Sequence, residues 1–392
     1  MDRPLRVIEV STAVTAAYAS MILGDLGCDV IKVEPLEGDR SRRWPPLLPD
    51  SGYFESLNRN KRSINLDLKS EAGREVLDRL LGQADVLICN YRPKARTKLG
   101  LDPETVHARH PHLVYATIHG SGSNGPRADE GSTDVFAQAA TGLMSITGSD
   151  PDKIAKIPMP IADLVAGLYT VIGIFHELRS TQGQRPARHI EVTLEDSALS
   201  LLLYFLSDYS QTGVIPRPAG TTHPNITPYE TYRAADRDIA VIVFNDAAWV
   251  RACAAIGRED LAKDPRLATV AKRREHRAEV TEAFAAAIRE HPAEYWLKHL
   301  KMADIPCALV RNIAEVVNDP EYRERGSIVE VDMASGQRIA VATSPVTLDG
   351  ERLGIRMTAP RLGAHTAEIL AELGYSPQEQ QEIQRSGAAG GA

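Results

Sequence analysis

One aspartate stands in a sequence context that could support covalent chemistry. Asp163 follows Pro158 and Pro160 and precedes an apolar run that continues to Phe175. The prolines cannot propagate a helix, so we expect a helix to start at Asp163, with its carboxylate as the N-cap. The positive end of the helix dipole favours the ionised form of this carboxylate, which could attack an activated acyl group. A cap without further role is the commoner use of such an aspartate, so these residues alone leave both interpretations open.

The apolar run after Asp163 predicts a buried helix, because no side of it is polar. Neither this run nor a second one from Ala198 to Leu206 reaches the ~20 apolar residues that span a membrane. The N-terminal residues lack the apolar core of a signal peptide. The four cysteines lie far apart without a C-x-x-C pair, which predicts a reduced compartment and no zinc site. We therefore expect a soluble, cytoplasmic protein without a bound metal.

The composition is that of a globular protein. Of the 392 residues, 43% are hydrophobic and 25% are charged, so the chain can form a sizeable core and is long enough for two domains. The formal net charge of −7 argues against a nucleic-acid-binding protein, which needs a basic face.

Short apolar strands alternate with helical patterns over the first 120 residues. The expected strands are 6–11, 29–34, 85–90 and 113–119, and the expected helices are 16–26, 70–83 and 103–109. This alternation predicts a doubly wound α/β domain with a parallel sheet, which binds ligands beyond the carboxyl ends of its strands. The first strand is not followed by G-x-G-x-x-G, and the loop 120–126 lacks a Lys-Ser/Thr pair. Neither a classical dinucleotide site nor a P-loop is therefore expected.

The rest of the chain predicts further elements in both patterns. They are a helix over 134–143, the Asp163 helix, a strand over 189–194, a helix from 195 to about 210, a hairpin over 229–244, helices over 246–256, 273–290 and 293–303, strands over 307–311, 328–331 and 338–342, and helices over 365–373 and 377–385. Residues 211–226 are rich in Gly, Pro and Thr and are typical of a linker. The tail from Ser386 is expected to fray.

Six stretches of the sequence together carry a family resemblance. They are Val30–Glu34, Asn58–Lys69 (NRNKRSINLDLK), Ala84–Pro93 (ADVLICNYRP), Pro160–Asp163, His223–Tyr229 and Ala359–Thr366. These stretches resemble the class III CoA-transferases, which include formyl-CoA and carnitine CoA-transferases and are related to α-methylacyl-CoA racemase. The resemblance runs from about residue 5 to 375, nearly the whole chain.

The resemblance implies an architecture and an activity. The implied protein is an interlocked homodimer whose large α/β domain is built from 1–210 and 328–392, with a small α+β domain over 227–327 inserted after the linker. The implied activity is transfer of coenzyme A from an acyl-CoA thioester to a free carboxylic acid, without a metal or redox cofactor. The family nucleophile matches Asp163, and the implied reaction passes through an aspartyl anhydride and an aspartyl-CoA thioester.

The resemblance also implies contacts to CoA. The positions that match such contacts are Val14, Thr15, Leu66, Asp67, Leu68, Lys69, Asn90, Tyr91, Arg92 and Lys98. Position 35, a cation in many relatives, is Pro35 here, and Arg40 or Arg42 is expected to replace that charge. A solvated basic face is the alternative interpretation for the cations Lys61, Arg62 and Lys69.

Four residues are expected near the acyl group. Asp134 matches an acidic position of the family, and a cap on its own helix is the alternative interpretation. Thr133, Thr222 and His223 complete the expected substrate contacts.

Two other functions stay open. Racemases of the superfamily carry a histidine base at the position of Thr133, and a threonine cannot exchange an α-proton, which disfavours an acyl-CoA racemase or isomerase. The other alternative is an acyl-CoA-binding protein that has lost activity, motivated by Thr15–Ala17 in place of the usual Ala-Gly-Pro and by Pro35. The sequence does not identify the acids that exchange CoA.

Overall fold

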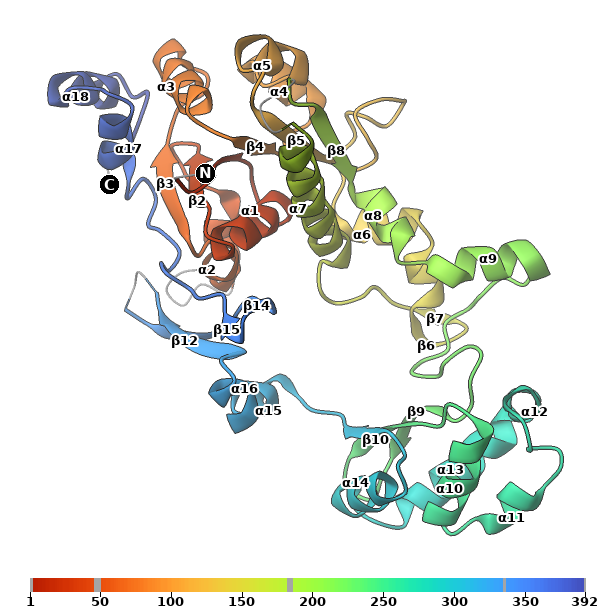
Figure 1. Ribbon diagram of the computed structural model, residues 1–392. Coiled ribbons are helices and arrows are strands. Elements are labelled where there is room, and N and C mark those ends of the chain that lie inside the picture. The colour runs from red at the N-terminus through yellow and green to blue at the C-terminus, as the bar shows by residue number, and fades with distance from the viewer. Residues whose placement is uncertain (1–2, 46–50, 182–185, 334–335, 391–392) are drawn as a thin grey trace. The chain divides into compact units, whose positions relative to one another are not determined.

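The structure is a computed structural model, and it describes residues 3–45, 51–181, 186–333 and 336–390. The chain forms two compact units (Figure 1). The first unit comprises Met1–Leu143, Ile157–Ser210 and Pro320–Ala392, and the second comprises Met144–Lys156 and Gln211–Asp319.

The division differs from the predicted domains at two segments. The sequence places 144–156 in the large domain and 320–327 in the small one, whereas each segment groups with the other unit. The first segment forms a hairpin of β6 (Gly148–Asp150) and β7 (Lys153–Ile154). The amide of Gly220, in the second unit, donates to the carbonyl of Gly148 at 3.0 Å, which ties the hairpin to that unit.

A six-stranded parallel sheet forms the centre of the first unit and confirms the predicted α/β class. Its order is β3-β2-β1-β4-β5-β8, and all neighbouring strands are parallel. The strands are β1 (Arg6–Val10), β2 (Asp29–Glu34), β3 (Lys61–Asn65), β4 (Val86–Cys89), β5 (Val114–His119) and β8 (His189–Thr193). The strand order reverses between β1 and β4, and ligands of doubly wound sheets bind at such a switch point.

Helices cover both faces of this sheet (Figure 1). Ile8 and Val10 of β1 pack with α3 (Glu71–Gly82), α5 (Pro103–Arg109) and α17 (Thr366–Glu372). Val7 packs with α1 (Thr15–Asp25) and α7 (Ile161–Thr181) on the opposite face. Successive side chains of a strand point to opposite faces, so Glu9 of β1 faces the layer of α1 and α7. The other helices of this unit are α2 (Gly52–Leu57), α4 (Pro93–Leu99), α6 (Asp134–Ala140), α8 (Leu194–Ser200), α16 (Pro320–Glu324), α18 (Pro377–Arg385) and the 3-10 helix η1 (Arg40–Arg43). Helix α9 (Leu203–Thr212) and the 3-10 helix η2 (Leu143–Ile146) begin in the first unit and end in the second.

Helix α7 is longer than the apolar run that predicts it. It continues past Phe175 to Thr181. The segment Ile161–Ser180 is long and apolar enough to cross a membrane by length and composition. This finding corrects the expectation that the apolar segment is too short to span a membrane. The same test is passed by core helices of soluble proteins, so a single such helix is weak evidence for a membrane span.

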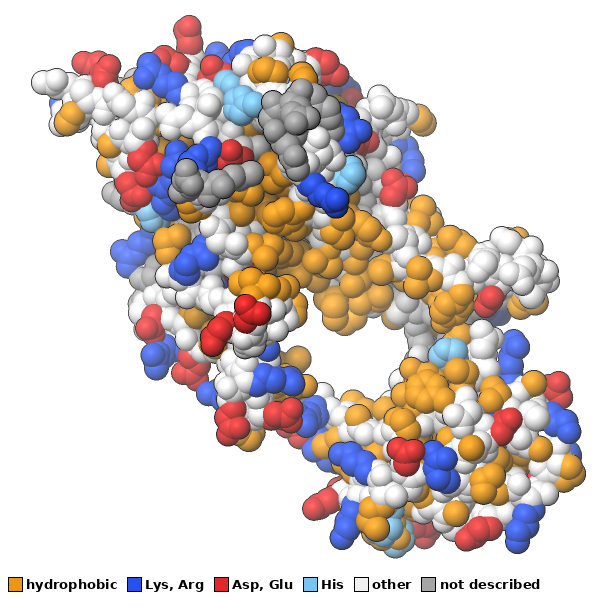
Figure 2. Space-filling view, in the orientation of Figure 1, with side chains coloured by type: hydrophobic (Ala, Val, Ile, Leu, Met, Phe, Trp, Pro, Cys, Tyr) orange, Lys and Arg blue, Asp and Glu red, His pale blue; other side chains and the backbone are white. Residues whose placement is uncertain are grey.

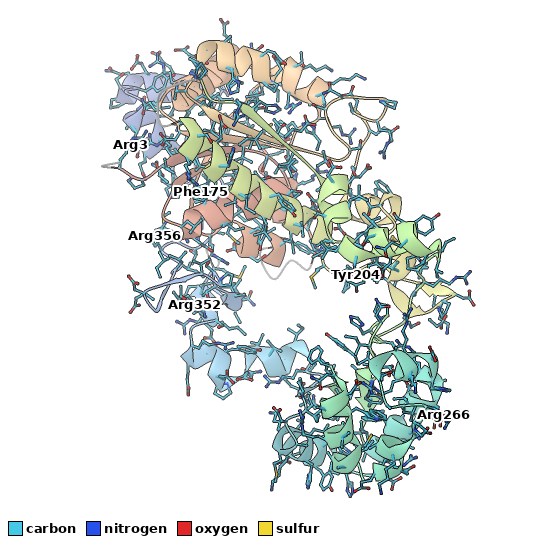
Figure 3. All side chains as sticks on the ribbon, turned by 45° about the vertical axis from the view of Figure 1, so that its right-hand side comes forward. Arg3, Phe175, Tyr204, Arg266, Arg352 and Arg356 are labelled. Carbon is cyan, nitrogen blue, oxygen red and sulfur yellow. The ribbon has the colours of Figure 1, made fainter. Side chains whose placement is uncertain are left out.

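One side of α7 carries an exposed apolar stripe. Leu168, Ile172 and Phe175 recur at helical spacing and are 45%, 61% and 41% exposed. Figure 2 shows hydrophobic surface over this helix, and Figure 3 labels Phe175 there and Tyr204 on α9, which is also exposed. The prediction of a helix buried on every side is therefore wrong for the single chain, because only the side that includes Ala166 packs on the core.

The helix predicted from 195 to about 210 is interrupted. Helix α8 ends at Ser200, and α9 begins at Leu203. Leu203 has a φ of +34°, on the left-handed side of the backbone map where a leucine is rare, so the helical path cannot continue through it.

Strand β3 lies where the sequence pattern gives no strand. The ammonium of Lys61 is fully buried and donates to Glu9 Oε2 at 2.9 Å. The guanidinium of Arg62 pairs with Asp29 at 2.7 Å. A solvated basic face is therefore the wrong interpretation for these two cations, although Lys69 is exposed.

The C-terminal tail pairs with the edge of the sheet, so the fraying predicted from Ser386 is wrong. Ala389 is buried and forms an antiparallel bridge with Leu66. The amide of Asp67 donates to the carbonyl of Ala388 at 2.8 Å. A Cβ atom on Gly390 would lie 2.1 Å from the side chain of Asn65, the last residue of β3, so the tail approaches the strand too closely for a larger residue there.

The second unit has its own core around a three-stranded antiparallel sheet. Its order is β11-β10-β9, and the predicted hairpin is confirmed by β9 (Tyr229–Arg233) and β10 (Asp238–Ile242). Trp249, Phe284 and Trp296 are buried beneath the helices. The remaining elements here are β11 (Cys307–Leu309), α10 (Asp246–Ala255), α11 (Glu259–Lys263), α12 (Val270–Glu275), α13 (Arg277–Arg289), α14 (Ala293–Met302) and α15 (Ile313–Val317).

Two small antiparallel pairs complete the first unit. They are β12 (Ile328–Asp332) with β13 (Arg338–Ala342), and β14 (Thr347–Leu348) with β15 (Glu351–Arg352). The strands predicted at 328–331 and 338–342 and the two C-terminal helices are thus confirmed.

Candidate active site

Asp163 lies in the first turn of α7, two residues after the helix begins at Ile161. It is therefore not the N-cap that the prolines suggest. The hydroxyl of Thr15, the first residue of α1, donates a hydrogen bond to Asp163 Oδ1. The start of one helix thus holds the carboxylate at the start of the other.

Small residues allow α1 and α7 to approach this closely. A Cβ atom on Gly167 would lie 2.9 Å from the ring of Tyr18 and 3.1 Å from the carbonyl oxygen of Thr15. Ala16 and Ala166 are fully buried in the same contact region. The approach removes water from one side of Asp163, which remains partly exposed.

Asp134 caps α7 and not its own helix. Its Oδ1 accepts the amide hydrogen of Ala162 at 2.8 Å, and its Oδ2 accepts the side-chain amide of Gln138 at 2.6 Å. The N-cap of α6 is Thr133, which makes no side-chain capping bond and is exposed. The cap on its own helix is therefore the wrong interpretation: Asp134 accepts from an amide of the neighbouring helix, one residue before Asp163. Its contact with an acyl group stays a prediction.

Gln138 was missed by the sequence analysis. It is fully buried and accepts the amide of Ile157 at 2.9 Å, so it fixes the segment that leads into α7. Its place one helical turn after Asp134 is the only signal in the sequence that could have indicated it.

The environment shifts the pKa of Asp163 upward. Burial raises the pKa to about 6, the hydrogen bond from Thr15 acts in the opposite direction, and the charge of Asp134 raises it further. This is the reverse of the direction expected from the helix dipole. At neutral pH most of the carboxylate is still ionised, and it is less solvated than a surface aspartate, as a nucleophile requires.

Two adjoining pockets lie at the carboxyl ends of β2, β3 and β4. The larger, of about 430 Å³, is lined by predicted CoA-contacting residues together with residues that follow β2. These predicted residues are Leu66, Asp67, Leu68, Lys69 and Tyr91. The smaller, of about 300 Å³, is lined by Arg92, Lys94 and Lys98, and Ala95 lines both. The structure thus places seven of the predicted CoA residues around two pockets that share Ala95.

Four other predicted CoA residues lie elsewhere. The side-chain amide of Asn90 donates to the carbonyl of Thr12 at 2.8 Å and its oxygen accepts the amide of Thr12 at 3.1 Å, so Asn90 holds the loop after β1. Arg40 donates to the hydroxyl of the same threonine at 3.1 Å. Val14 is buried, and Thr15 contacts the candidate nucleophile.

Arg42 does not replace the cation missing at Pro35. Its guanidinium forms a two-point ion pair with Glu34, with both distances 2.8 Å. Glu34 is fully buried, so this pair fixes the loop after β2 and leaves Arg40 as the remaining candidate.

Thr222 and His223 lie in the second unit. The hydroxyl of Thr222 donates to Glu230 at 3.2 Å. His223 Nδ1 accepts two backbone amides at 3.1 Å, from Asn225 and Ile226, which leaves the proton of the neutral ring on Nε2. Burial lowers the pKa of His223, and the charge of Arg277 lowers it further. The contact of both residues with an acyl group stays a prediction.

A metal site was not found in the part of the chain that the structure describes. No three His, Cys, Asp or Glu side chains are grouped to hold an ion there. The four cysteines are free.

Comparisons with known proteins agree on one family. Residues 3–366 match the family model described as CoA-transferase family III. A succinate–glutarate CoA-transferase of Agrobacterium fabrum is 34% identical over 382 residues, covering 94% of both chains. A succinyl-CoA:mesaconate CoA-transferase of Haloarcula hispanica is 32% identical over 385 residues, covering 94% of this chain and 96% of that protein.

A solved structure supports the same conclusion. A CaiB/BaiF family protein from Brucella suis superimposes with a TM-score of 0.83 at 34% identity, covering 94% of this chain and 98% of that one. The range matched by the family model, 3–366, includes the parallel sheet and Asp163. The chain belongs to CoA-transferase family III.

Proposed function

We propose that the protein transfers CoA from an acyl-CoA to a free carboxylic acid, with Asp163 as the nucleophile. The carboxylate attacks the thioester carbonyl and displaces the CoA thiolate, which leaves an acyl-aspartyl anhydride. The thiolate then attacks the aspartyl carbonyl, so the donor acid leaves as a carboxylate and an aspartyl-CoA thioester forms. An acceptor carboxylate attacks this thioester, which gives a new anhydride and again a thiolate. The thiolate attacks the acceptor's acyl carbonyl, which forms the product acyl-CoA and frees Asp163.

The observation that carries this proposal is the state of the Asp163 carboxylate. It has one hydroxyl donor, Thr15, and its pKa near 6 leaves it ionised but weakly solvated at neutral pH. Among the described residues, no arginine or lysine forms an ion pair with it, so its electron pairs are not neutralised by a cation. Such a carboxylate can form an anhydride without a separate general base.

We further propose that the paired pockets bind CoA. The larger pocket combines apolar surface from Leu68 and Tyr91 with the polar side chains of Asp67 and Lys69. A mostly apolar pocket with a few polar groups suits the adenosine of CoA. The smaller one offers Arg92 and Lys98 to phosphate groups, while Lys94 pairs with Asp129 at 3.2 Å.

Dicarboxylic acids are the proposed class of substrate. The relatives reported above are named for succinate, glutarate and mesaconate, and all of these are dicarboxylates. No observation favours a racemase: the threonine at position 133 is exposed and has no acid–base function to offer. A binding protein without turnover is separated from a transferase by the first experiment below.

We also propose that a second copy of the chain covers the stripe on α7, as an interlocked homodimer of this family would. Leu168, Ile172 and Phe175 form an apolar surface on a helix that otherwise packs in the core. Surfaces of this kind on soluble proteins mark interaction sites.

Incubation with succinyl-CoA followed by hydroxylamine should modify the peptide that contains Asp163. Intact-protein and peptide mass spectrometry should show a CoA-sized or trapped adduct in the wild type and none in Asp163→Asn, whose side chain has the same shape but is not a nucleophile. The variant should lose at least about 10³-fold in kcat while retaining CoA binding. Adduct formation on another residue, or turnover by the variant, would contradict the proposal.

The acid limb of the pH–rate profile should follow Asp163, with a midpoint near 6 and activity lost below it, because only the ionised form attacks. Asp134→Asn removes a like charge yet keeps an acceptor for Ala162, so the pKa of Asp163 should fall and activity at pH 5.5 should rise roughly two- to threefold relative to the plateau. Thr15→Val removes a bond that favours the ionised form and should move the limb to higher pH. Equal midpoints in all three proteins would contradict this assignment.

Lys98→Ala should weaken CoA binding about tenfold, the effect of one lost phosphate contact worth about 1.4 kcal/mol. Calorimetric titration should show little change for a pantetheine thioester, which has no such phosphates to contact. Lys263→Ala, on exposed α11 in the second unit, is the control for a lost positive charge. Equal affinities of wild type and Lys98→Ala for CoA would remove Lys98 from the site.

Light scattering after gel filtration should give the wild type twice the mass of one chain. Ile172→Asp places a charge on the stripe and should yield monomer or insoluble protein, whereas Ser180→Asp, on the exposed end of the same helix, should stay dimeric. A monomeric wild type would refute the proposed assembly.

A further inference from the structure

Four charged side chains are buried together between the sheet and α1. Glu9, Lys32 and Lys61 are fully buried, and Asp39 is 1% exposed. Glu9 Oε1 accepts from Lys32 at 2.6 Å and Glu9 Oε2 accepts from Lys61 at 2.9 Å. Lys32 also pairs with Asp39 at 3.0 Å. We name these four residues the buried charge cluster.

Stability alone is a poor explanation for the buried charge cluster. Replacing buried ion pairs by well-packed apolar residues is often neutral or stabilising by about 1–4 kcal/mol, because desolvation costs as much as the charges gain. Three of the contacts that leave the cluster are more informative, because they end on α1 or on the loop that precedes it.

Two of these contacts hold the first turns of α1. Lys61 Nζ donates to the carbonyl oxygen of Ala17 at 2.9 Å. The hydroxyl of Ser20 donates to Glu9 Oε2 at 2.6 Å. The cluster therefore fixes the axial position of the helix whose first residue is Thr15.

The third contact holds an unfavourable backbone conformation. Ala13 has a φ of +70°, which costs an L-residue roughly 1 kcal/mol. Its amide donates to both carboxylate oxygens of Asp39, at 3.2 and 3.3 Å. Asp39 is also held by the amide and hydroxyl of Ser41, each at 2.8 Å, so it is a rigid acceptor for the turn.

We propose that Asp39, oriented by Lys32, is a positioning residue that sets the Thr12–Ala13 turn and thereby aims the Thr15 hydroxyl at Asp163. The proposal rests on the proposed role of Asp163 as the nucleophile. It assigns the buried charge cluster a catalytic consequence although no member of it contacts Asp163 in the described structure.

Asp39 stays ionised over the pH range in which Asp163 titrates, so it can hold the Thr12–Ala13 turn throughout that range. Burial alone would raise the pKa of Asp39, but Lys32 and the Ser41 contacts outweigh it and hold the pKa below its ordinary value. Asp39 therefore stays ionised while Asp163 titrates near pH 6, so the acid limb of the wild type reports Asp163 and not its support.

The decisive comparison uses Asp39→Ala, alone and combined with Ala13→Gly. Asp39→Ala releases the turn, so Thr15 no longer lowers the pKa of Asp163. The acid limb should move to higher pH and kcat should fall about tenfold, with KM for the acyl-CoA changed less than about threefold. Glycine adopts a φ of +70° without strain. The double variant should therefore recover a large part of kcat and bring the midpoint back toward 6.

Asp25→Ala is the matched control for loss of stability. Asp25 ends the same helix, at the opposite end from Thr15, and forms a buried ion pair with Arg59 at 2.7 Å. Its loss should lower the melting temperature but leave the midpoint of the acid limb unchanged. If Asp39→Ala does not fold, Asp39→Asn, which loses only the charge paired with Lys32, should show a smaller shift in the same direction.

Failure of this inference can be told from failure of the proposed function. If Asp39→Ala lowers the melting temperature as Asp25→Ala does but keeps the wild-type midpoint and kcat, the positioning role is refuted. The same holds if Ala13→Gly restores nothing to the Asp39→Ala protein. If the Asp163 peptide carries no adduct and Asp163→Asn turns over, the nucleophile itself is wrong, whatever Asp39 does.

Discussion

The packing of α1 on α7 sets the chemistry of Asp163, since Gly167 leaves no room for a Cβ atom between the two helices. Complete burial without a donor would neutralise the carboxylate, and a close cation would stabilise its charge so strongly that attack would become slow. The structure lies between these limits, with one hydroxyl donor from Thr15 and a like charge on Asp134. Each of these depends on the position of a helix start, which is why small shifts of α1 or α6 would change reactivity.

The sheet supports this arrangement through the alternation of its side chains. Ile8 and Val10 of β1 face the apolar layer of α3, whereas Glu9 faces α1, where an apolar residue would have been the simpler choice. Glu9 accepts four hydrogen bonds, among them one from Ser11 at 2.5 Å, so its charge is fully compensated. The hydrogen bonds of Glu9 fix the distances and angles to its partners, which dispersion contacts of an apolar side chain would not do.

Much of the fold could be predicted, because periodic patterns report local structure. The strands at 29–34 and 189–194 and the final helices follow directly from apolar spacing. The burial of Lys61 and Arg62 could not be predicted from the sequence pattern, because cationic side chains are usually exposed to solvent. Only their carboxylate partners in the folded structure make burial possible. The tail after Ser386 has no apolar pattern of its own, and its order comes entirely from the strand edge that it meets.

The candidate site could also be predicted only where the signal is local in the sequence. The position of Asp163 came from its sequence context and from the family motif, and the residues from Leu66 to Lys69 lie in a shared pocket because they form one loop after an edge strand. The role of Asp134 did not follow, since a cap on another helix depends on where α6 begins relative to α7. The hydrogen bonds of Asn90 did not follow for a similar reason: its side-chain amide binds the backbone of Thr12, a partner 78 residues earlier, and its contact with CoA stays a prediction.

In the proposed dimer, the exposed stripe on α7 would connect assembly to catalysis. Leu168 and Ile172 lie between one and three turns from Asp163 on the same helix, so a second copy that covers them would also restrict water near the first turn of α7. Additional desolvation would raise the pKa of Asp163 further, as burial within the single chain already does. In the proposed dimer the carboxylate would therefore need the Thr15 hydrogen bond more than it does in a single chain, because that bond is the contact that keeps it ionised. On this argument the supports of α1 matter most when the protein is assembled, and a chain that cannot assemble would hold a better solvated and less reactive carboxylate.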